Sequence, residues 1–243
     1  MVNINRTTSV PVKSSVFRGV TRALPIVMGY VPIGFAYGVL AKQAGLSVFN
    51  AVAMSVLVYA GSAQLVGAGL FAAAAPALSI IATTFVVNLR HMLFSAALSP
   101  YLKGWRKFEL AIFAYELTDE TFAVHSVSFP EGVPSKAEVI AVNVTAQLSW
   151  LCGSWLGAVV GGLIKDVRPL ALDYTLPAMF IALLVMQIKV RAEIIVAVLT
   201  GGLAVVLTLM GLDRWSVILA TLVGATLGVL FEQIATRREG GMA

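Results

Sequence analysis

The chain has 243 residues, of which 59% are hydrophobic and 12% charged, whereas about a quarter of the residues in soluble domains are charged. This composition excludes an ordinary soluble protein and indicates an all-α integral membrane protein. The formal charge of +5 comes from lysines and arginines scattered singly near the ends of apolar segments, which suits lipid headgroups and argues against nucleic-acid binding.

Long apolar segments follow one another from Arg22 almost to the C-terminus. Because about 20 apolar residues suffice to cross a bilayer as a helix, the chain is predicted to form a polytopic bundle of seven to eight transmembrane helices. Residues 1–21 lack the apolar core and cleavage site of a signal peptide, so we expect a polar cytoplasmic tail there, a single bundle over 22–232 and a short tail over 233–243. The predicted spans cover residues 22–41, 48–71, 76–99, 109–128, 138–164, 174–189, 192–211 and 215–232.

The first span is unusually rich in proline and glycine. Its sequence LPIVMGYVPIGFAYG places Pro25, Pro32 and Gly34 close together. Proline removes a backbone donor and glycine loosens a helix, so we expect a kink or an unwound turn between Tyr30 and Gly34. In a membrane, such a break either packs against a neighbouring helix or, as in transporters, aims freed backbone amides at a substrate.

The second span contains the sequence YAGSAQ at 59–64, which is poorly suited to facing lipid. Gly61 permits a tight backbone path, while Ser62 and Gln64 need hydrogen-bond partners at membrane depth. These residues either join helices together or line a polar cavity. The same composition makes 48–71 the best candidate for a broken or re-entrant helix that fails to cross the membrane.

The number of membrane crossings depends on whether residues 48–71 cross the membrane. With eight crossings, the lysines and arginines outside the spans divide almost evenly between the two sides. With seven, the basic N-terminal tail and the loop containing Lys103, Arg106 and Lys107 share the cytoplasmic face. The positive-inside rule favours seven crossings, and both counts stay open.

Charged residues lie at the centres of the third and fourth spans. A central arginine costs about 2.5 to 3.5 kcal/mol on the insertion scale, and ionised acids are similarly expensive. Arg90 stands alone in its span, whereas Glu116, Asp119 and Glu120 would share one face of a continuous helix. We expect Arg90 to pair with one of these carboxylates, either as a structural ion pair or within a site whose remaining acids carry protons or bind cations.

Other polar residues in the spans have less specific interpretations. His91 is either a proton relay or a hydrogen-bonded structural histidine, and His125 is predicted to lie at the membrane interface. Asn143 and Gln147 share a helix face and are expected to add a polar stripe to a cavity. Glycines that recur every four residues predict close helix packing; these are Gly153, Gly157 and Gly161, and also Gly224 and Gly228.

The motifs LPIVMGYVPIGFAYG, YAGSAQ, NLRH and ELTDETFA, in this order and spacing, make the chain resemble the AzlC family of branched-chain amino acid exporters. The likeness is strongest over residues 22–125. It implies a multi-pass protein of the bacterial cytoplasmic (inner) membrane that exports valine, leucine and isoleucine, driven by an ion gradient. It also implies a small partner membrane subunit of the AzlD type.

The resemblance implies functional roles for residues in three of the motifs. They are Gly61, Ser62 and Gln64, then Arg90 and His91, and then Asp119 and Glu120. Asn88 and Glu116 stand where a member of the family has Asp and Gly, which puts their roles in doubt.

A branched-chain amino acid needs a cation or helix N-terminus for its carboxylate, an acceptor for its ammonium and an apolar pocket. A protonated acid would loosen its hold on Arg90 and shift the balance between inward-open and outward-open states. The predicted substrate-binding residues are Gly34, Gly61, Ser62, Gln64, Asn88 and Arg90. The predicted proton-coupling residues are His91, Glu116, Asp119 and Glu120.

Two other functions remain as alternatives. A channel or a non-transporting assembly subunit would need no alternating access. An intramembrane hydrolase could use Ser62, His91 and Asp119 as a triad, although the sequence contains no nucleophile elbow and no HExxH motif. Cys152 is the only cysteine, which excludes an intramolecular disulfide and argues against a cysteine metal cluster. We expect neither an enzyme nor a cofactor.

Overall fold

The computed structural model describes residues 12–164, 174, 177–178, 181, 184–185, 188, 190–212, 216 and 219–229, and these residues contain helices and no strand. The chain forms two compact units, residues 1–179 and 180–243, and each is described by itself. The predicted tail 233–243 and most of the predicted span 174–189 lie outside the described residues. The prediction of a single bundle between two tails remains a prediction.

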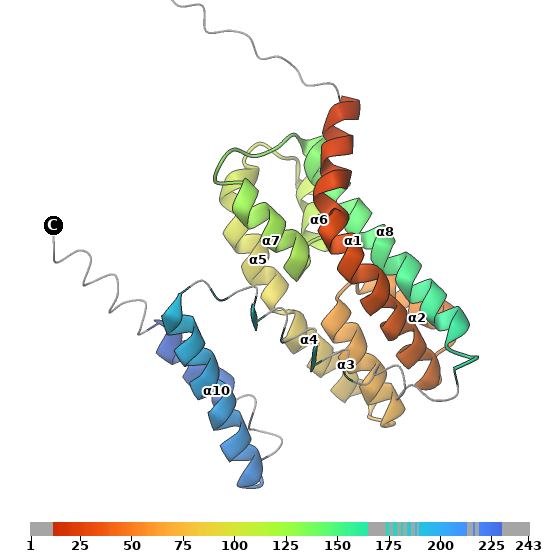
Figure 1. The fold of residues 1–243 in the computed structure, drawn as a ribbon, viewed down its shortest axis with the longest axis vertical. Helices are drawn as coiled ribbons and strands as arrows, with labels where there is room; N and C mark the ends of the chain where they lie inside the picture. Colours follow the sequence, from red (N-terminus) through yellow and green to blue (C-terminus); the bar gives the residue numbers. More distant parts are fainter. Residues whose placement is uncertain are drawn as a thin grey trace, which may run out of the picture. The chain divides into compact units, whose positions relative to one another are not determined.

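The first unit is built on two long helices, α1 (Val12–Gln43) and α8 (Lys136–Val160), which run in the same direction side by side (Figure 1). Glycines bring the two backbones close together, since a Cβ atom on Gly157 would lie only 2.0 Å from the Phe35 carbonyl oxygen. Gly153 and Gly161 also face α1 closely, so the predicted packing role of these glycines is confirmed. We use the Val12 end and the Gln43 end of α1 to name the two ends of the unit.

Helix α1 differs from its prediction in two ways. It starts at Val12, ten residues before the predicted span, because Gly19 packs against α8 and Arg18 pairs with Glu138 of α8. It also continues without interruption through Pro25 and Pro32. The predicted unwound turn is therefore wrong: close packing on α8 from Gly19 to Val39 stabilises the helical path despite the hydrogen bonds that the prolines remove.

The second predicted span is a hairpin of two short helices, α2 (Val48–Leu57) and α3 (Gly61–Ala72). It starts near the Gln43 end, where the Tyr37 hydroxyl donates to the Ala51 carbonyl. It turns at Tyr59, whose φ is 43°, and α3 returns beside α2, as the approach of Gly67 to Met54 shows. The expected broken helix is present, and it returns to the end at which it entered.

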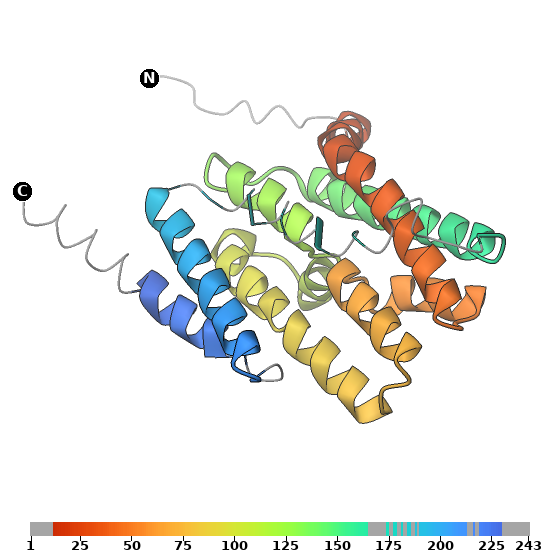
Figure 2. The ribbon, with the colours of Figure 1, turned by 60° about the horizontal axis from the view of Figure 1, so that its bottom comes forward.

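The third predicted span crosses the whole unit in three consecutive pieces. These are α4 (Ala77–Asn88), α5 (Arg90–Leu98) and the 3₁₀ turn η1 (Ser99–Leu102), with a break at Leu89. They run opposite to α1, towards the Val12 end (Figure 2). Arg90 thus lies near mid-height, at the break.

The fourth predicted span is a second hairpin, made of α6 (Lys107–Tyr115) and α7 (Asp119–Ser128). It enters from the Val12 end, where Lys136 Nζ lies 2.5 Å from Glu109 Oε2. It turns at Glu116–Thr118 and returns to a buried apolar cluster at the same end. The prediction of one continuous helix over 109–128 is wrong, because Thr118 has an extended backbone and caps a new helix. The cluster contains Leu98, Leu102, Phe113, Leu117, Phe129 and Val139.

Among the described residues, four helices are long and apolar enough to cross a membrane: Val12–Gln43, Ala77–Leu102, Lys136–Val160 and Ala192–Leu209. The last belongs to α10 (Arg191–Leu209) of the second unit, where Gly224 of the helix Leu219–Val229 packs closely on Thr200. The predicted count of seven to eight crossings is not confirmed. Within residues 12–164, two of the five predicted spans are hairpins that do not run the length of the unit.

Candidate functional site

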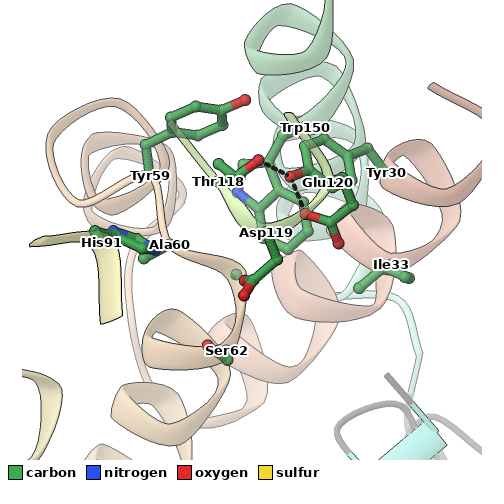
Figure 3. A pocket seen from close by; sticks show the side chains of 11 residues that line it. Tyr30, Ile33, Tyr59, Ala60, Ser62, His91, Thr118, Asp119, Glu120 and Trp150 are labelled. Atoms are coloured by element: carbon green, nitrogen blue, oxygen red, sulfur yellow. Dashed lines mark hydrogen bonds between the residues drawn. The ribbon is translucent and has the colours of Figure 1, made fainter. Parts of the chain in front are cut away.

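The tips of the two hairpins meet halfway along the α1–α8 pair and enclose a small cavity (Figure 3). The Tyr59 and Tyr115 rings, one from each tip, have centroids 6.3 Å apart. The cavity volume is about 20 Å³, which is room for about one water molecule. Its lining residues are Tyr30, Ile33, Tyr59, Ala60, Gly61, Ser62, His91, Thr118, Asp119, Glu120 and Trp150.

One side of the cavity is the start of α3. The first-turn N–H groups of a helix have no acceptor within the helix and carry a partial positive charge. Ala60 occupies the N-cap position, where no side chain accepts from these amides. The amides of Gly61 and Ser62 therefore form a natural place for a carboxylate beside the cavity.

Arg90 joins this helix start to the second hairpin. Its Nη2 lies 3.0 Å from Asp119 Oδ2 and also donates to the Ser62 hydroxyl. The side chains of Arg90 and Asp119 are 23% and 12% exposed, so water screens this pair only partly. The predicted pairing of Arg90 with one of the three acids is confirmed, although Arg90 itself lies behind the residues that line the cavity.

Thr118 and Glu120 attach the second hairpin to α1. The Tyr30 hydroxyl lies 2.7 Å from Thr118 Oγ1 and 2.5 Å from Glu120 Oε2 (Figure 3). Since a hydroxyl carries a single proton, one of these two contacts must be donated towards Tyr30. The arrangement is therefore a short chain of hydrogen bonds whose direction depends on which oxygen carries a proton.

Buried polar atoms without a hydrogen-bond partner gather around the hairpin tips. Such atoms are rare in folded proteins, and each costs about 1 to 3 kcal/mol. Of the seven that the described residues contain, five lie at the tips or at the break between α4 and α5. The region around the tips therefore contains several polar atoms that are available for further hydrogen bonds. The five atoms are Tyr59 Oη, Asn88 Oδ1, Arg90 Nε, His91 Nε2 and Glu116 Oε2.

The first hairpin is attached to α8 by a ring of buried hydrogen bonds. Trp150 Nε1 donates to Gln64 Oε1 at 3.0 Å, and Gln64 Nε2 donates to Ser55 Oγ at 2.9 Å. Ser55 then donates to Ser154, one turn beyond Trp150, at 2.8 Å. The polar atoms of Gln64 are thus used in packing, and Gln64 does not line the cavity.

The structure brings together half of the residues proposed from sequence. Gly61, Ser62, His91, Asp119 and Glu120 line the cavity. The other predicted residues lie elsewhere: Gly34 packs on the backbone of α8 and has no freed amide, and Asn88 and Glu116 are near the tips but not in the lining. The expectation that Glu116 shares a helix face with Asp119 and Glu120 is wrong, because the helix ends before Glu116 and a new one starts at Asp119.

The other polar predictions on this unit also need correction. His125 is buried rather than interfacial, because its Nε2 lies 2.7 Å from Asn143 Oδ1 inside the bundle. Gln147 donates to the Tyr115 hydroxyl, which itself donates to the Val56 carbonyl. Asn143 and Gln147 therefore position neighbouring helices instead of forming a stripe in the cavity.

Sequence reasoning missed the residues that come from α1, from α8 and from the capping position. Tyr30 and Trp150 are apolar in pattern and lie in long helices, so nothing local marks them. Thr118 did carry a signal, since a threonine followed by two acids is typical of a helix start. The structure has this cap, with the Thr118 hydroxyl accepting from the Thr121 amide.

The arrangement of Ser62, His91 and Asp119 is not that of a hydrolase triad. The Ser62 hydroxyl accepts from Arg90, which also separates it from Asp119. His91 Nε2 has no hydrogen-bond partner, whereas a catalytic base must hold the nucleophile within hydrogen-bond reach. No group of three or more metal-ligating side chains occurs in the described part of the chain.

Comparison with known proteins gives consistent results. The family model described as "AzlC protein" matches residues 25–164. The "Inner membrane protein YgaZ" of Escherichia coli (strain K12) is 30% identical over 227 residues, which cover 90% of each chain. An "Uncharacterized membrane protein" of Archaeoglobus fulgidus is 34% identical over 219 residues, 88% of this chain and 95% of the relative.

A further relative carries a transport description. The "Branched-chain amino acid transport protein AzlC" of Bacillus subtilis (strain 168) is 26% identical over 165 residues, 68% of this chain and 64% of the relative. No solved structure matches the chain.

Proposed function

This chain is a membrane protein of the AzlC family, and on that premise we propose that it exports branched-chain amino acids across the bacterial cytoplasmic membrane in exchange for protons. The description of the Bacillus subtilis relative supports the substrate class. A small membrane subunit of the AzlD type is the proposed partner, and the bilayer is the proposed surrounding. The observation that carries the proposal is the Arg90–Asp119 ion pair beside a small cavity at mid-height of the unit.

The cavity offers each part of a branched-chain amino acid a suitable group. The carboxylate binds the amides of Gly61 and Ser62, with the guanidinium of Arg90 close behind. The ammonium or the exchanged proton binds Asp119 and Glu120. The aliphatic side chain contacts the apolar part of the lining, which includes Ile33.

Transport requires the cavity to open, because about 20 Å³ holds a water molecule and not an amino acid. The conformation described is therefore closed around the site. Protonation of Asp119 removes its charge, which weakens its attraction to Arg90 and releases the guanidinium for the substrate carboxylate. His91 and Glu116, with polar atoms that have no hydrogen-bond partner, are proposed to take part in delivering that proton.

The two ends of the first unit differ in charge, which supports an orientation. The Val12 end carries Lys13, Arg22 and the loop with Lys103, Arg106 and Lys107. Positively charged loops favour the cytoplasmic side, so we assign the Val12 end to the cytoplasm. In this arrangement the α6–α7 hairpin enters from the cytoplasmic face and the α2–α3 hairpin from the opposite face.

The test is transport of labelled valine in proteoliposomes, with and without the AzlD-type subunit, under imposed pH gradients. We expect valine to move against its gradient only when protons flow in the opposite direction, and only with both subunits present. Valine uptake that is independent of the pH gradient would contradict the proposed coupling to protons.

Counterflow separates a carrier from a channel. Labelled valine should accumulate transiently in vesicles that contain excess unlabelled valine, because a carrier exchanges one for the other. Simple equilibration would support the channel alternative instead.

A further inference from the structure

One side of the cavity is apolar and is formed by α8, α1 and the start of α3. Trp150, in the middle of α8, is 2% exposed and lines the cavity together with Ile33 and Ala60. The acids and the histidine of the lining are on other elements: His91 on α5, and Asp119 and Glu120 on α7. The cavity therefore has an aromatic and aliphatic wall that lies beside its charged groups (Figure 3).

We propose that Trp150 determines specificity by setting the upper limit on the size of the amino acid side chain that the site accepts. The inference rests on the proposed function, and it names the residue that restricts an amino acid carrier to short branched side chains. It concerns side-chain selection alone and is independent of the direction of transport and of the coupling ion.

The Trp150 ring is fixed from several directions. Its Nε1 hydrogen bond to Gln64 belongs to the closed ring that returns to α8 through Ser55. The Tyr30 ring meets it edge-on, with centroids 5.4 Å apart, and the Tyr37 ring stacks on it at 6.0 Å. Rotation of the indole would break a buried hydrogen bond and two aromatic contacts at once, so the ring cannot swing aside to admit a larger side chain.

Gly61 completes the wall. A Cβ atom at this position would lie 2.8 Å from Trp150 Cη2, which is closer than real carbon contacts allow. The indole therefore occupies the space that a side chain at position 61 would fill. This packing fixes where the ring stands relative to the amides at the start of α3, and hence how far an aliphatic side chain can extend when the carboxylate binds those amides.

The consequence is an asymmetric preference. A rigid apolar pocket rejects oversized side chains by collision, whereas it separates smaller ones only by about 10- to 200-fold per methylene. A charged hairpin that opens would enlarge the cavity on its polar side but leave the indole in place. We therefore expect a sharp limit above leucine and a gradual decline below valine.

The first experiment uses the unaltered protein with its partner subunit. Unlabelled alanine, valine, leucine, methionine, phenylalanine and tryptophan compete in turn against labelled valine in proteoliposomes. Competition should increase from alanine to leucine and then fall abruptly for the aromatic amino acids. A steady increase through phenylalanine and tryptophan would overturn the proposal, because a wall of fixed size cannot produce it.

Two variants test the residue itself, and they change selectivity in opposite directions. Trp150→Phe shortens the wall, so the ratio of phenylalanine to valine transport should rise on the order of tenfold. Gly61→Ala adds a methyl group between the start of α3 and the fixed indole, both of which line the cavity, so the remaining space should shrink and leucine should lose more than alanine. Trp155→Phe is the matched control, because Trp155 is on the same helix but half exposed, and its selectivity should equal that of the unaltered protein.

The outcomes distinguish a failure of the proposed function from a failure of the role of Trp150. If the unaltered protein transports no amino acid, the proposed function fails. If it transports valine and both Trp150→Phe and Gly61→Ala keep the original ratios, the role of Trp150 fails while the proposed function stands. If Trp150→Phe does not fold, Gly61→Ala and the competition series on the unaltered protein still decide the question.

Discussion

The two hairpins of the first unit have the same form but are held in different ways. Both consist of a short helix, a tip at mid-height and a second short helix, and they enter from opposite ends. The α2–α3 hairpin is tied to α1 and α8 by buried hydrogen bonds between uncharged groups, from Tyr37, Ser55 and Gln64. The α6–α7 hairpin also has bonds between uncharged groups, Tyr30–Thr118 and His125–Asn143. Its tip differs in that carboxylates hold it as well, through Asp119 and Glu120.

This difference in chemistry implies a difference in how the two hairpins respond to protons. Hydrogen bonds between uncharged, buried groups do not respond to pH within the physiological range, so binding of a proton leaves them unchanged. Contacts made by carboxylates change when a proton binds. We infer that α2–α3 is the fixed half of the site and that α6–α7 is the half that opens.

Asp119→Asn should have the largest effect on this comparison. The substitution keeps the shape of the side chain but removes the charge and the proton-binding oxygen, so gradient-driven valine export should fall to the background of empty liposomes. The measurement is valine flux under an imposed pH gradient. Glu131→Gln, in an exposed loop, is the control and should keep full flux. Full activity of Asp119→Asn would remove both the proton role and the reason to treat α6–α7 as the moving half.

Arg90→Lys should have the next largest effect. Arg90 Nη2 contacts both Ser62 and Asp119. Because the lysine side chain is shorter than that of arginine, its ammonium should keep only one of these contacts. A hydrogen bond to a charged group contributes about 1.5 to 3 kcal/mol, so the KM for valine should rise about tenfold or more. Arg22→Lys, at the ion pair with Glu138, should leave the KM unchanged.

Arg90→Leu separates a structural role from a binding role. If Arg90 only neutralises the acids, the leucine variant should have a lower melting temperature. The folded fraction of this variant should still show an increase in melting temperature when valine is added. If Arg90 contributes to binding, the valine-induced thermal shift should disappear. An unchanged melting temperature together with an unchanged shift would contradict both roles.

The charged parts of this site could be predicted from sequence because burying charge is costly. A central arginine in one span and acids in the next predicted an ion pair, and Arg90–Asp119 is that pair. The small residues of YAGSAQ likewise predicted the break at Tyr59–Ala60. Both signals are local in sequence.

The remaining parts could not be predicted because they depend on contacts between distant residues. Tyr30 and Thr118 are 88 residues apart, and Trp150 and Gln64 are 86 apart. Prolines suggested a broken α1, but packing on α8 keeps it helical. Continuous hydropathy over 109–128 hid the hairpin, although Thr118 before two acids is a capping signal.

Tyr30→Phe should have a moderate effect on the opening of the α6–α7 tip. It removes the hydroxyl that contacts both Thr118 and Glu120, so hydrogen exchange of the amides near Thr118 should increase about three- to tenfold. Tyr37→Phe is the matched control, because the Tyr37 hydroxyl contacts α2 from the same helix. Equal effects of the two variants on exchange near Thr118 would contradict the assignment of separate roles to the hairpins.

Gln64→Leu should have the smallest effect on transport and a clear effect on stability. Gln64 accepts from Trp150 and donates to Ser55 but does not line the cavity. Leucine leaves the Trp150 N–H without a buried acceptor, which costs about 1 to 3 kcal/mol, so the melting temperature should fall. The KM for valine should stay within about twofold of the original.

Lower stability with an unchanged KM is the result expected for a residue of the fixed half. Such a residue positions the wall of the site but does not contact the substrate. If Gln64→Leu instead raises the KM strongly and leaves the melting temperature unchanged, then Gln64 contacts the substrate, as the YAGSAQ motif first suggested. The hydrogen-bonded ring would then have to open during transport, and α2–α3 could no longer be the hairpin that stays in place.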